Sequence, residues 1–195
     1  VSHRRHGMMN PNALLRGHLT LDDYLNARII VDPLRLYDCV LPCSGGDAVI
    51  LTSIERARSL KAPPVYILAA GQHHNYRPND VVLLEHGWKS FAADLFDQAG
   101  LGPRDLSMLQ LYDNYPIMEV IQLEDFGFCP KGDGGRFVAE TDFSIGGQLP
   151  LNTGGGQLSC GQAGAGGALL GAVEAVRQLR GEAGPRQVEA ASSAL

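Results

Sequence analysis

Two short segments carry the residue types that could do chemistry. The first is a glycine-rich run, residues 152–163 (NTGGGQLSCGQA), which leads into a predicted helix. Clustered glycines let the backbone turn with positive φ or come very close to another group. A loop that feeds a helix also turns its main-chain N–H groups and the positive end of the helix dipole into one site. Such a site could bind a phosphate, a thioester oxygen or an enolate. Tight packing of a helix on a sheet, with no ligand, is the alternative.

The second segment is residues 112–115 (YDNY), placed where an apolar strand ends and a helix begins. Functional groups gather at the carboxyl ends of strands in open α/β sheets. Tyr112 could therefore donate a proton or a hydrogen bond to a developing oxyanion. For Asp113 we favour a structural role, as a cap of the helix that follows it.

The cysteines give weaker signals. Cys160 lies at the junction of loop and helix, where a thiolate would be stabilised, but a buried inert thiol is the favoured interpretation. Cys39 and Cys43 have no second Cys/His pair at a matching spacing, so we expect no metal site. Four cysteines in 195 residues fit free thiols in a reducing cytoplasm better than a disulfide scaffold.

Composition limits the function further. Hydrophobic residues make up 45% of the chain, which is enough for a folded core. The net charge of -5 and the lack of a basic face argue against nucleic acid as a partner. The sequence contains no apolar run of about 18 residues, so we expect no membrane span. We expect a cytoplasmic protein.

The elements that must position the two segments alternate along the chain. Strands are predicted at residues 48–52, 65–71 and 107–111, the first of them as a buried strand. Helices are predicted at residues 21–27, 54–60, 87–99, 116–126 and 164–180. This alternation predicts an α/β fold with a mixed sheet. We expect one domain, residues 1–195, in which residues 1–47 include a loop or covering segment and residues 1–20 are irregular.

A succession of motifs resembles a known family. Residues 9–13 (MNPNA), 48–53 (AVILTS), 112–113 (YD) with 126–132 (FGFCPKG), and 152–161 (NTGGGQLSCG) follow one another as in the C-terminal half of thiolases of the sterol-carrier-protein type. The resemblance covers about residues 2–182. It implies a thiolase-like α/β half, with a central mixed sheet flanked by helices, in a subunit that pairs as a homodimer.

The resemblance also shows departures at the expected catalytic positions. The family takes its nucleophilic cysteine from the N-terminal half. A Gly-His-Pro motif is replaced here by Gly161, Gln162 and Ala163. Gln162 cannot take a proton from a thiol, although its amide can donate a hydrogen bond to a thioester oxygen. The Tyr-Asp pair is similar to lipid-transfer-protein retro-aldolases, which cleave β-hydroxyacyl-CoA between Cα and Cβ. Tyr112 falls on the first of their two tyrosine positions and Gln162 on the second.

The resemblance therefore implies a thiolase-like acyltransferase, in the class of acetyl-CoA acetyltransferases of lipid metabolism, that forms or breaks carbon–carbon bonds of acyl-CoA. A retro-aldolase subunit and a non-catalytic acyl-CoA-binding module are the alternatives. Tyr112 and Gln162 are the catalytic candidates; the candidates for binding an oxyanion or CoA are Asn152, Gly155, Gly156 and Gly161. Coenzyme A enters as part of the substrate, with no other cofactor. The implied partners are an N-terminal thiolase half, a second copy and a small zinc/OB-fold protein, and we expect this chain alone to be inactive.

Overall fold

The computed structural model describes residues 1–77, 79 and 84–195. Its α-helices are α1 (Ser2–Met8), α2 (Leu21–Leu25), α3 (Ile54–Arg58), α4 (Ala92–Ala99), α5 (Pro116–Asp125), α6 (Gly134–Glu140), α7 (Gly156–Cys160) and α8 (Leu170–Leu179). Short 3-10 helices are η1 (Leu36–Asp38), η2 (Gly87–Ser90), η3 (Pro103–Asp105), η4 (Gly164–Leu169) and η5 (Gly184–Arg186). Two strands, β1 (Ile29–Val31) and β2 (Leu34–Arg35), form an antiparallel hairpin.

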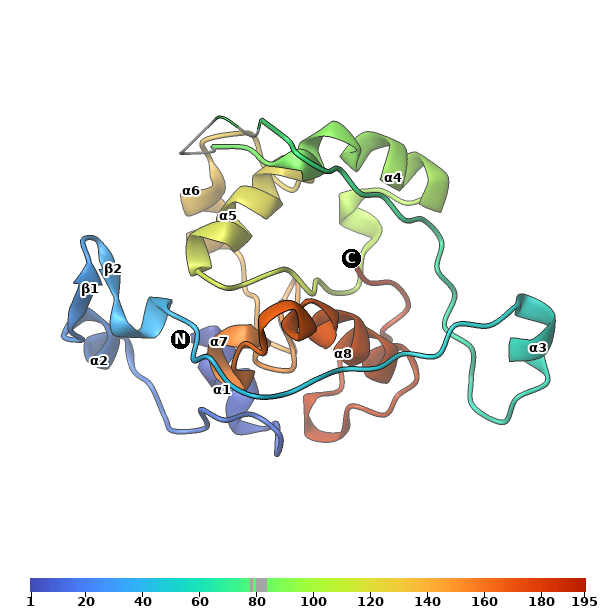
Figure 1. Cartoon of the computed structure of the whole chain (residues 1–195), viewed down its shortest axis with the longest axis horizontal. Helices are drawn as coiled ribbons and strands as arrows, with labels where there is room; N and C mark the ends of the chain where they lie inside the picture. Colours follow the sequence, from blue (N-terminus) through green and yellow to red (C-terminus); the bar gives the residue numbers. More distant parts are fainter. Residues whose placement is uncertain (78, 80–83) are drawn as a thin grey trace.

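Most of the helices form two groups, while α2 lies beside the hairpin and α3 stands apart from both groups (Figure 1). One group holds α4, α5 and α6; the other holds α1, α7 and α8. After η1 the chain runs extended past α8 to α3, and residues 63–72 lead back from α3, again extended. Residues from both halves of the sequence therefore meet near α7.

The expected central mixed sheet is not formed within the described residues. Beyond the hairpin, the pairing consists of isolated parallel bridges: Leu109 with Leu151, Met108 with Ala194, and Pro42 with Gln162. The first two place residues 107–111 between the segments around residues 151 and 194. These bridges are the start of parallel strand pairing. They hold the segment that leads directly to Tyr112.

The prediction of strands at residues 48–52 and 65–71, the first of them buried, is wrong for this chain. Both segments are extended, but Ile50 is 94% exposed and Ile67 is 68% exposed. A β-branched run favours an extended backbone, whereas a strand also needs a neighbour to satisfy its N–H and C=O groups. Neither segment has such a neighbouring strand among the described residues. The backbone is therefore extended, as the sequence favours, but it forms no sheet.

The hydrophobic core lies where α5 packs on the bridged segments. Its buried members are Leu109, Leu111, Leu123, Phe143, Leu149 and Leu151. Helix α5 begins with Pro116, whose fixed φ and missing N–H suit the first turn of a helix. Leu123 on α5 is fully buried against the core. This packing fixes the end of the 107–111 segment, and with it the turn at residues 112–115.

Several predicted helices are confirmed with their caps. Thr20 forms a capping box with Asp23 at the start of α2, and Ser53 accepts a hydrogen bond from the N–H of Arg56 in α3. Helix α4 ends at Gly100, which has φ +65°. Three α-helices were not predicted: α1, in residues expected to be irregular, α6, and α7, which lies inside the glycine-rich run. None of the helices in residues 1–77, 79 and 84–195 has the length and apolar character to cross a bilayer.

Candidate functional site

The end of the 107–111 segment lies directly beside the glycine-rich run. The N–H of Leu109 donates to the carbonyl of Pro150 at 2.8 Å, and the N–H of Asn152 donates back to the carbonyl of Leu109 at 2.9 Å. These reciprocal bonds align residues 107–111 with residues 149–152. The turn that follows the first segment and the glycines that follow the second therefore emerge side by side.

Tyr112 and Gln162, the two predicted catalytic residues, are in contact. The Gln162 side-chain Nε2 lies 3.0 Å from the Tyr112 hydroxyl oxygen and donates to it. Main-chain bonds hold Gln162 in place: its N–H donates to the carbonyl of Leu41, and its carbonyl accepts from the N–H of Cys43. Residues 50 positions apart in sequence thus form one polar pair. The catalytic assignment itself stays a prediction.

Gly161 completes this end of the run. Its φ is +94°, and a Cβ there would lie 2.7 Å from the Cys43 Sγ and 2.8 Å from a methyl carbon of Leu14. Only glycine fits both the conformation and the space. Gly161 is therefore fixed by packing, and that packing sets the position of the Gln162 amide.

The other end of the run is closed by Asp113. The main-chain N–H groups of Gln157 and Leu158 donate to the two carboxylate oxygens of Asp113, at 2.8 and 3.1 Å. Asp113 therefore caps α7, not α5 as predicted, because the fold brings α7 closer to it than the helix that follows in sequence. The anion at the N-terminus of α7 is thus a side chain of the protein itself.

Gly155 and Gly156 are glycines because of this closed packing. A Cβ on Gly155 (φ +100°) would meet the backbone of Gly7 at 2.8 Å, and a Cβ on Gly156 (φ +59°) would collide with the Asp113 carboxylate. Both residues pack against protein atoms. Their predicted contact with an oxyanion or with CoA stays a prediction, and the geometry explains the two glycines without a ligand.

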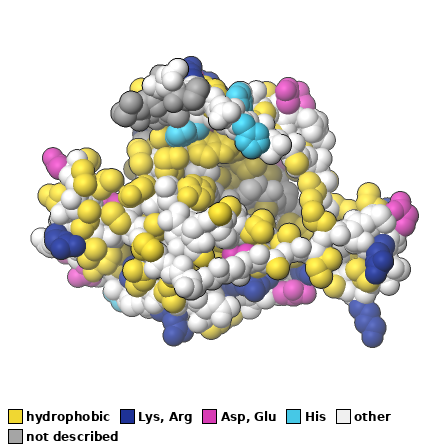
Figure 2. Space-filling view, viewed as in Figure 1, with side chains coloured by type: hydrophobic (Ala, Val, Ile, Leu, Met, Phe, Trp, Pro, Cys, Tyr) yellow, Lys and Arg dark blue, Asp and Glu magenta, His cyan; other side chains and the backbone are white. Residues whose placement is uncertain are grey.

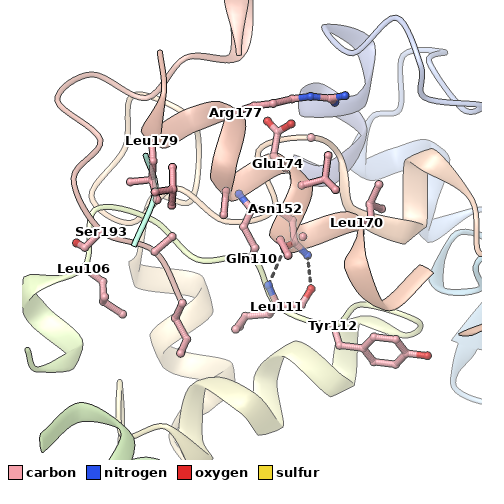
Figure 3. Close-up of a pocket in the computed structure, with 18 of the residues that line it drawn as sticks. Leu106, Gln110, Leu111, Tyr112, Asn152, Leu170, Glu174, Arg177, Leu179 and Ser193 are labelled. Atoms are coloured by element: carbon pink, nitrogen blue, oxygen red, sulfur yellow. Dashed lines mark hydrogen bonds between the residues drawn. The ribbon is translucent and has the colours of Figure 1, made fainter. Parts of the chain in front are cut away.

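Asn152 is engaged entirely within the protein. It is 2% exposed; its Oδ1 accepts from the N–H of Leu111, and its Nδ2 donates to the carbonyl of Leu111 and to Glu119 Oε1, at 3.0 and 2.7 Å (Figure 3). In Figure 3, Tyr112 extends away from this residue. The amide fixes the backbone just before Tyr112, so the contacts give Asn152 a supporting role. Its predicted ligand contact stays a prediction.

A buried acid–histidine cluster lies behind this site. His3 Nε2 is 2.8 Å from Glu119 Oε1 and 3.8 Å from Asp113 Oδ2. Burial alone lowers the pKa of His3, but the neighbouring Glu119 carboxylate outweighs it, so the pKa of His3 is raised overall. Burial raises the pKa of Asp113 to about 6. No local sequence signal pointed to His3, because its partners lie more than 100 residues away.

The same three side chains have ligand atoms within 4.8 Å of one another, and their types could hold a metal ion. Asn152 Nδ2 donates to Glu119 and lies 3.2 Å from His3 Nε2, so an N–H group already fills part of that space. The internal hydrogen bonds account for the cluster without an ion.

A polar network also connects the start of the glycine-rich run to α8. Thr153 Oγ1 donates to Glu174 Oε1 and accepts from Gln178 Nε2, both at 3.0 Å. Glu174 pairs with the guanidinium of Arg186 at 3.0 Å, and both side chains are buried. The Glu174 and Arg186 charges are paired, and the Thr153 hydroxyl both donates and accepts. The network therefore holds the glycine-rich run in place and offers no free reactive group.

Two of the four cysteines, Cys129 and Cys160, are poorly suited to act as nucleophiles. Burial raises the pKa of Cys160 to about 12, and its Sγ donates to the carbonyl of Gly154. Burial also raises the pKa of Cys129. Since the thiolate is the reactive form, a raised pKa makes both thiols weaker nucleophiles.

Comparisons with known proteins identify the family of the chain. The sequence model of a family described as thiolase C-terminal domain-like matches residues 69–195. The chain belongs to this family. Its thiolase-like α/β fold follows from that membership, although the central mixed sheet is not formed within the described residues.

Named relatives share this thiolase-like half. The chain is 42% identical to the 17-hydroxy-3-oxo-4-pregnene-20-carboxyl-CoA lyase of Mycobacterium tuberculosis and 38% identical to a steroid side-chain-cleaving aldolase of Thermomonospora curvata. Each match covers 93% of the chain and 48% of the relative. A solved structure of an Ltp2-ChsH2(DUF35) aldolase is similar to this chain, with a TM-score of 0.82 and 31% sequence identity. The match covers 100% of this chain and 52% of the aldolase chain. The chain spans about half the length of the curated relatives it matches.

Proposed function

We propose that the protein containing this thiolase-like half cleaves a β-hydroxyacyl-CoA between Cα and Cβ by a retro-aldol reaction. The observation that carries the proposal is the hydrogen bond from Gln162 Nε2 to the hydroxyl oxygen of Tyr112. The names of two relatives, a CoA lyase and a side-chain-cleaving aldolase, support the same reaction class.

The Tyr112–Gln162 bond orients the phenol for donation. Because the Tyr112 oxygen accepts from Gln162, its own hydrogen points elsewhere, and no acceptor for it is found in the described part of the chain. An amide neither gains nor loses a proton near neutral pH, so this arrangement does not depend on pH. A donor held in place before the reaction stabilises an oxyanion without reorganising.

The proposed reaction then balances without a redox step. The β-hydroxyl loses its proton to a base, and the Cα–Cβ electron pair moves onto the thioester to form an enolate. Tyr112 donates its hydrogen bond to the enolate oxygen. The carbonyl product leaves, and Cα takes up a proton. One β-hydroxyacyl-CoA thus gives one aldehyde or ketone and one shorter acyl-CoA, and coenzyme A, as part of the substrate, is the only cofactor required.

Acyl transfer by thiolysis has less support in this chain. It would need a base at the position of Gln162, and an amide cannot serve. The raised pKa of Cys160 removes that thiol as a second acid–base group. The broader class of thiolase-like acyltransferases, including acetyl-CoA acetyltransferases, therefore ranks second to the retro-aldolase.

The proposal includes partners. Each of the two relatives extends well beyond the matched half, which supports an N-terminal thiolase half that completes the acyl-CoA site. The similar solved structure is named as an aldolase with a DUF35 component, which supports a small partner protein, and we propose one of the zinc/OB-fold type. A homodimer and a cytoplasmic location are part of the same proposal.

The test is Tyr112→Phe in the assembly with its N-terminal half, assayed by release of the carbonyl product. We expect kcat to fall by about 100- to 10,000-fold with KM nearly unchanged, because the donor acts mainly in the transition state. Tyr115→Phe is the matched control: its side chain is exposed three residues away, and turnover should persist. Unchanged turnover in Tyr112→Phe would remove Tyr112 from the mechanism.

A further inference from the structure

The main chain of Tyr112 is held by a side chain and not by a neighbouring strand. Two residues earlier the partner is still main chain, since the N–H of Gln110 donates to the carbonyl of Leu195 at 2.7 Å. At Tyr112 the partner is the carboxamide of Gln122 on α5. The N–H of Tyr112 donates to Gln122 Oε1 at 3.1 Å, and Gln122 Nε2 donates to the carbonyl of Tyr112 at 2.7 Å. The amide thus takes the place that a strand would occupy beside Tyr112.

A carboxamide suits this place because it carries a donor and an acceptor side by side, as a peptide group does. Gln122 Nε2 also donates to the carbonyl of Met118 at 2.9 Å, one turn back on α5. Gln122 is only 3% exposed, so water has little access to compete for these bonds. The two main-chain groups of Tyr112 are therefore tied to α5 through one fully bonded side chain.

The placement of Tyr112 matters because its side chain lines a cavity of about 540 Å³. Figure 2 shows a hollow in the visible face with hydrophobic side chains around it. The hydroxyl oxygen of Tyr112 is held separately, by Gln162 Nε2 at 3.0 Å. A shift of the main chain would carry the phenol away from that amide and from a substrate in the cavity. A misplacement of about 1 Å can cost roughly 100-fold in rate.

We propose that Gln122 is a positioning residue for the reaction: its carboxamide fixes the main chain of Tyr112 and thereby the direction in which the phenol donates its hydrogen bond. The inference rests on the proposed function of Tyr112. Gln122 acts through Tyr112 and needs no contact with the substrate. Asn152 bonds both main-chain groups of Leu111 in the same way (Figure 3), so two successive amides hold the approach to the phenol.

The first test is Gln122→Met, a change of similar length that removes the amide, in the assembly with its N-terminal half. We expect kcat to fall by about 10- to 100-fold with KM nearly unchanged, because the substrate still binds but the donor is misplaced. Gln187→Met is the matched control. That amide also bonds three main-chain groups, those of Ala183, Gln178 and Val188, but it lies next to η5, and turnover should persist. Unchanged kcat in Gln122→Met, or equal losses in both variants, would overturn the inference.

A conservative variant separates the amide bonds from simple packing. In Gln122→Glu, burial favours the neutral carboxyl, which offers an acceptor oxygen and an O–H donor as the amide does. Assayed at about pH 6, Gln122→Glu should recover most of the kcat that Gln122→Met loses. Equal losses in these two variants would assign the effect to side-chain packing and overturn the inference.

Hydrogen exchange, read at single residues by mass spectrometry, tests the same contact without turnover. In the unmodified assembly the N–H of Tyr112 should exchange at least about tenfold more slowly, relative to its intrinsic rate, than the N–H of Asn114, which has no acceptor among the described residues. In Gln122→Met the Tyr112 rate should rise about five- to tenfold, while Leu109, bonded to Pro150, keeps its rate. Similar exchange of Tyr112 and Asn114 in the unmodified assembly would overturn the inference even if the variant does not fold.

The outcomes separate this inference from the proposed function. A loss of turnover in Tyr112→Phe together with unchanged turnover in Gln122→Met removes the positioning role and leaves the retro-aldol proposal standing. Unchanged turnover in Tyr112→Phe removes the catalytic role of the phenol, and with it the functional part of this inference. The exchange measurement still reports in that case whether the Gln122 amide holds the main chain of Tyr112.

Discussion

The two ends of one glycine-rich run have opposite relations to the rest of the protein. At the Gly155–Gly156 end, the N–H groups that open α7 are taken by the carboxylate of Asp113. At the Gly161–Gln162 end, the side-chain amide meets Tyr112, whose own O–H group remains available in the described part of the chain. We call the first the closed end, because the protein itself satisfies it, and the second the open end, because the Tyr112 hydroxyl hydrogen has no acceptor among the described residues.

The contrast means that a glycine-rich loop before a helix is not by itself an anion site. The dipole argument holds at α7, but the anion it attracts is internal. The residue that supplies this anion, Asp113, directly follows the tyrosine of the open end. The turn at residues 112–115 therefore serves both ends, closing one with its acid and equipping the other with its phenol.

The strongest perturbation is expected at the closed end. Gly156→Ala should lower the free energy of unfolding by about 4 kcal/mol, because it adds a left-handed alanine and a clash with Asp113. Chemical denaturation measures the change. Gly164→Ala is the control: its φ is +57°, but no atom lies within 4 Å of the added Cβ, so only the backbone cost of about 1 kcal/mol remains. Equal losses in the two variants would mean that the Asp113 contact is loose.

A somewhat smaller effect is the pH dependence of the closed end. The pKa of Asp113 is raised from 3.8 to about 6 in the folded protein, so its contribution to stability is present below about pH 4 and is lost as pH rises through about 6. The pKa of His3 is also raised, so its contribution is likewise lost as pH rises. The Asp113 difference corresponds to about 3 kcal/mol.

The measurement compares the unmodified chain with Asp113→Asn in denaturant titrations at pH values between about 4 and 8. The free energy of unfolding of the chain, relative to the variant, should decrease by about 3 kcal/mol across that range. His3 and Glu119, which face Asp113, are present in both proteins, so the part of their titration that does not depend on Asp113 cancels. A difference that stays constant with pH would contradict the shifted pKa of Asp113.

The weakest effect on stability belongs to the open end. Gln162→Leu removes one partly buried hydrogen bond and should cost about 1 kcal/mol or less. Activity in the assembled protein should fall much further, because the phenol loses the group that orients it. Gln162→Glu adds a test, since a carboxylate would accept the Tyr112 hydrogen and turn it away from the substrate. A large loss of stability with unchanged activity would make the open end structural too.

The local elements could largely be predicted from the sequence. The capping box at Thr20, the proline that starts α5 and the glycine that ends α4 are signals within a few residues, and the structure contains each of them. The extended backbone of residues 65–71 was also a local property. Its pairing into a sheet was not, because pairing depends on a neighbouring strand that local sequence does not supply.

The amino-acid sequence alone specified which residues are the candidates for chemistry at the open end: Tyr112 at the end of an apolar segment, and an amide at Gln162 where a histidine stands in similar thiolases. The contact between these two, the closure of α7 by Asp113 and the pairing of His3 with Glu119 became known only from the folded chain. The cause is the range of the interactions. Turns, caps and helix termini depend on neighbours a few residues away, whereas a hydrogen bond across 50 or 116 residues depends on how the whole chain packs.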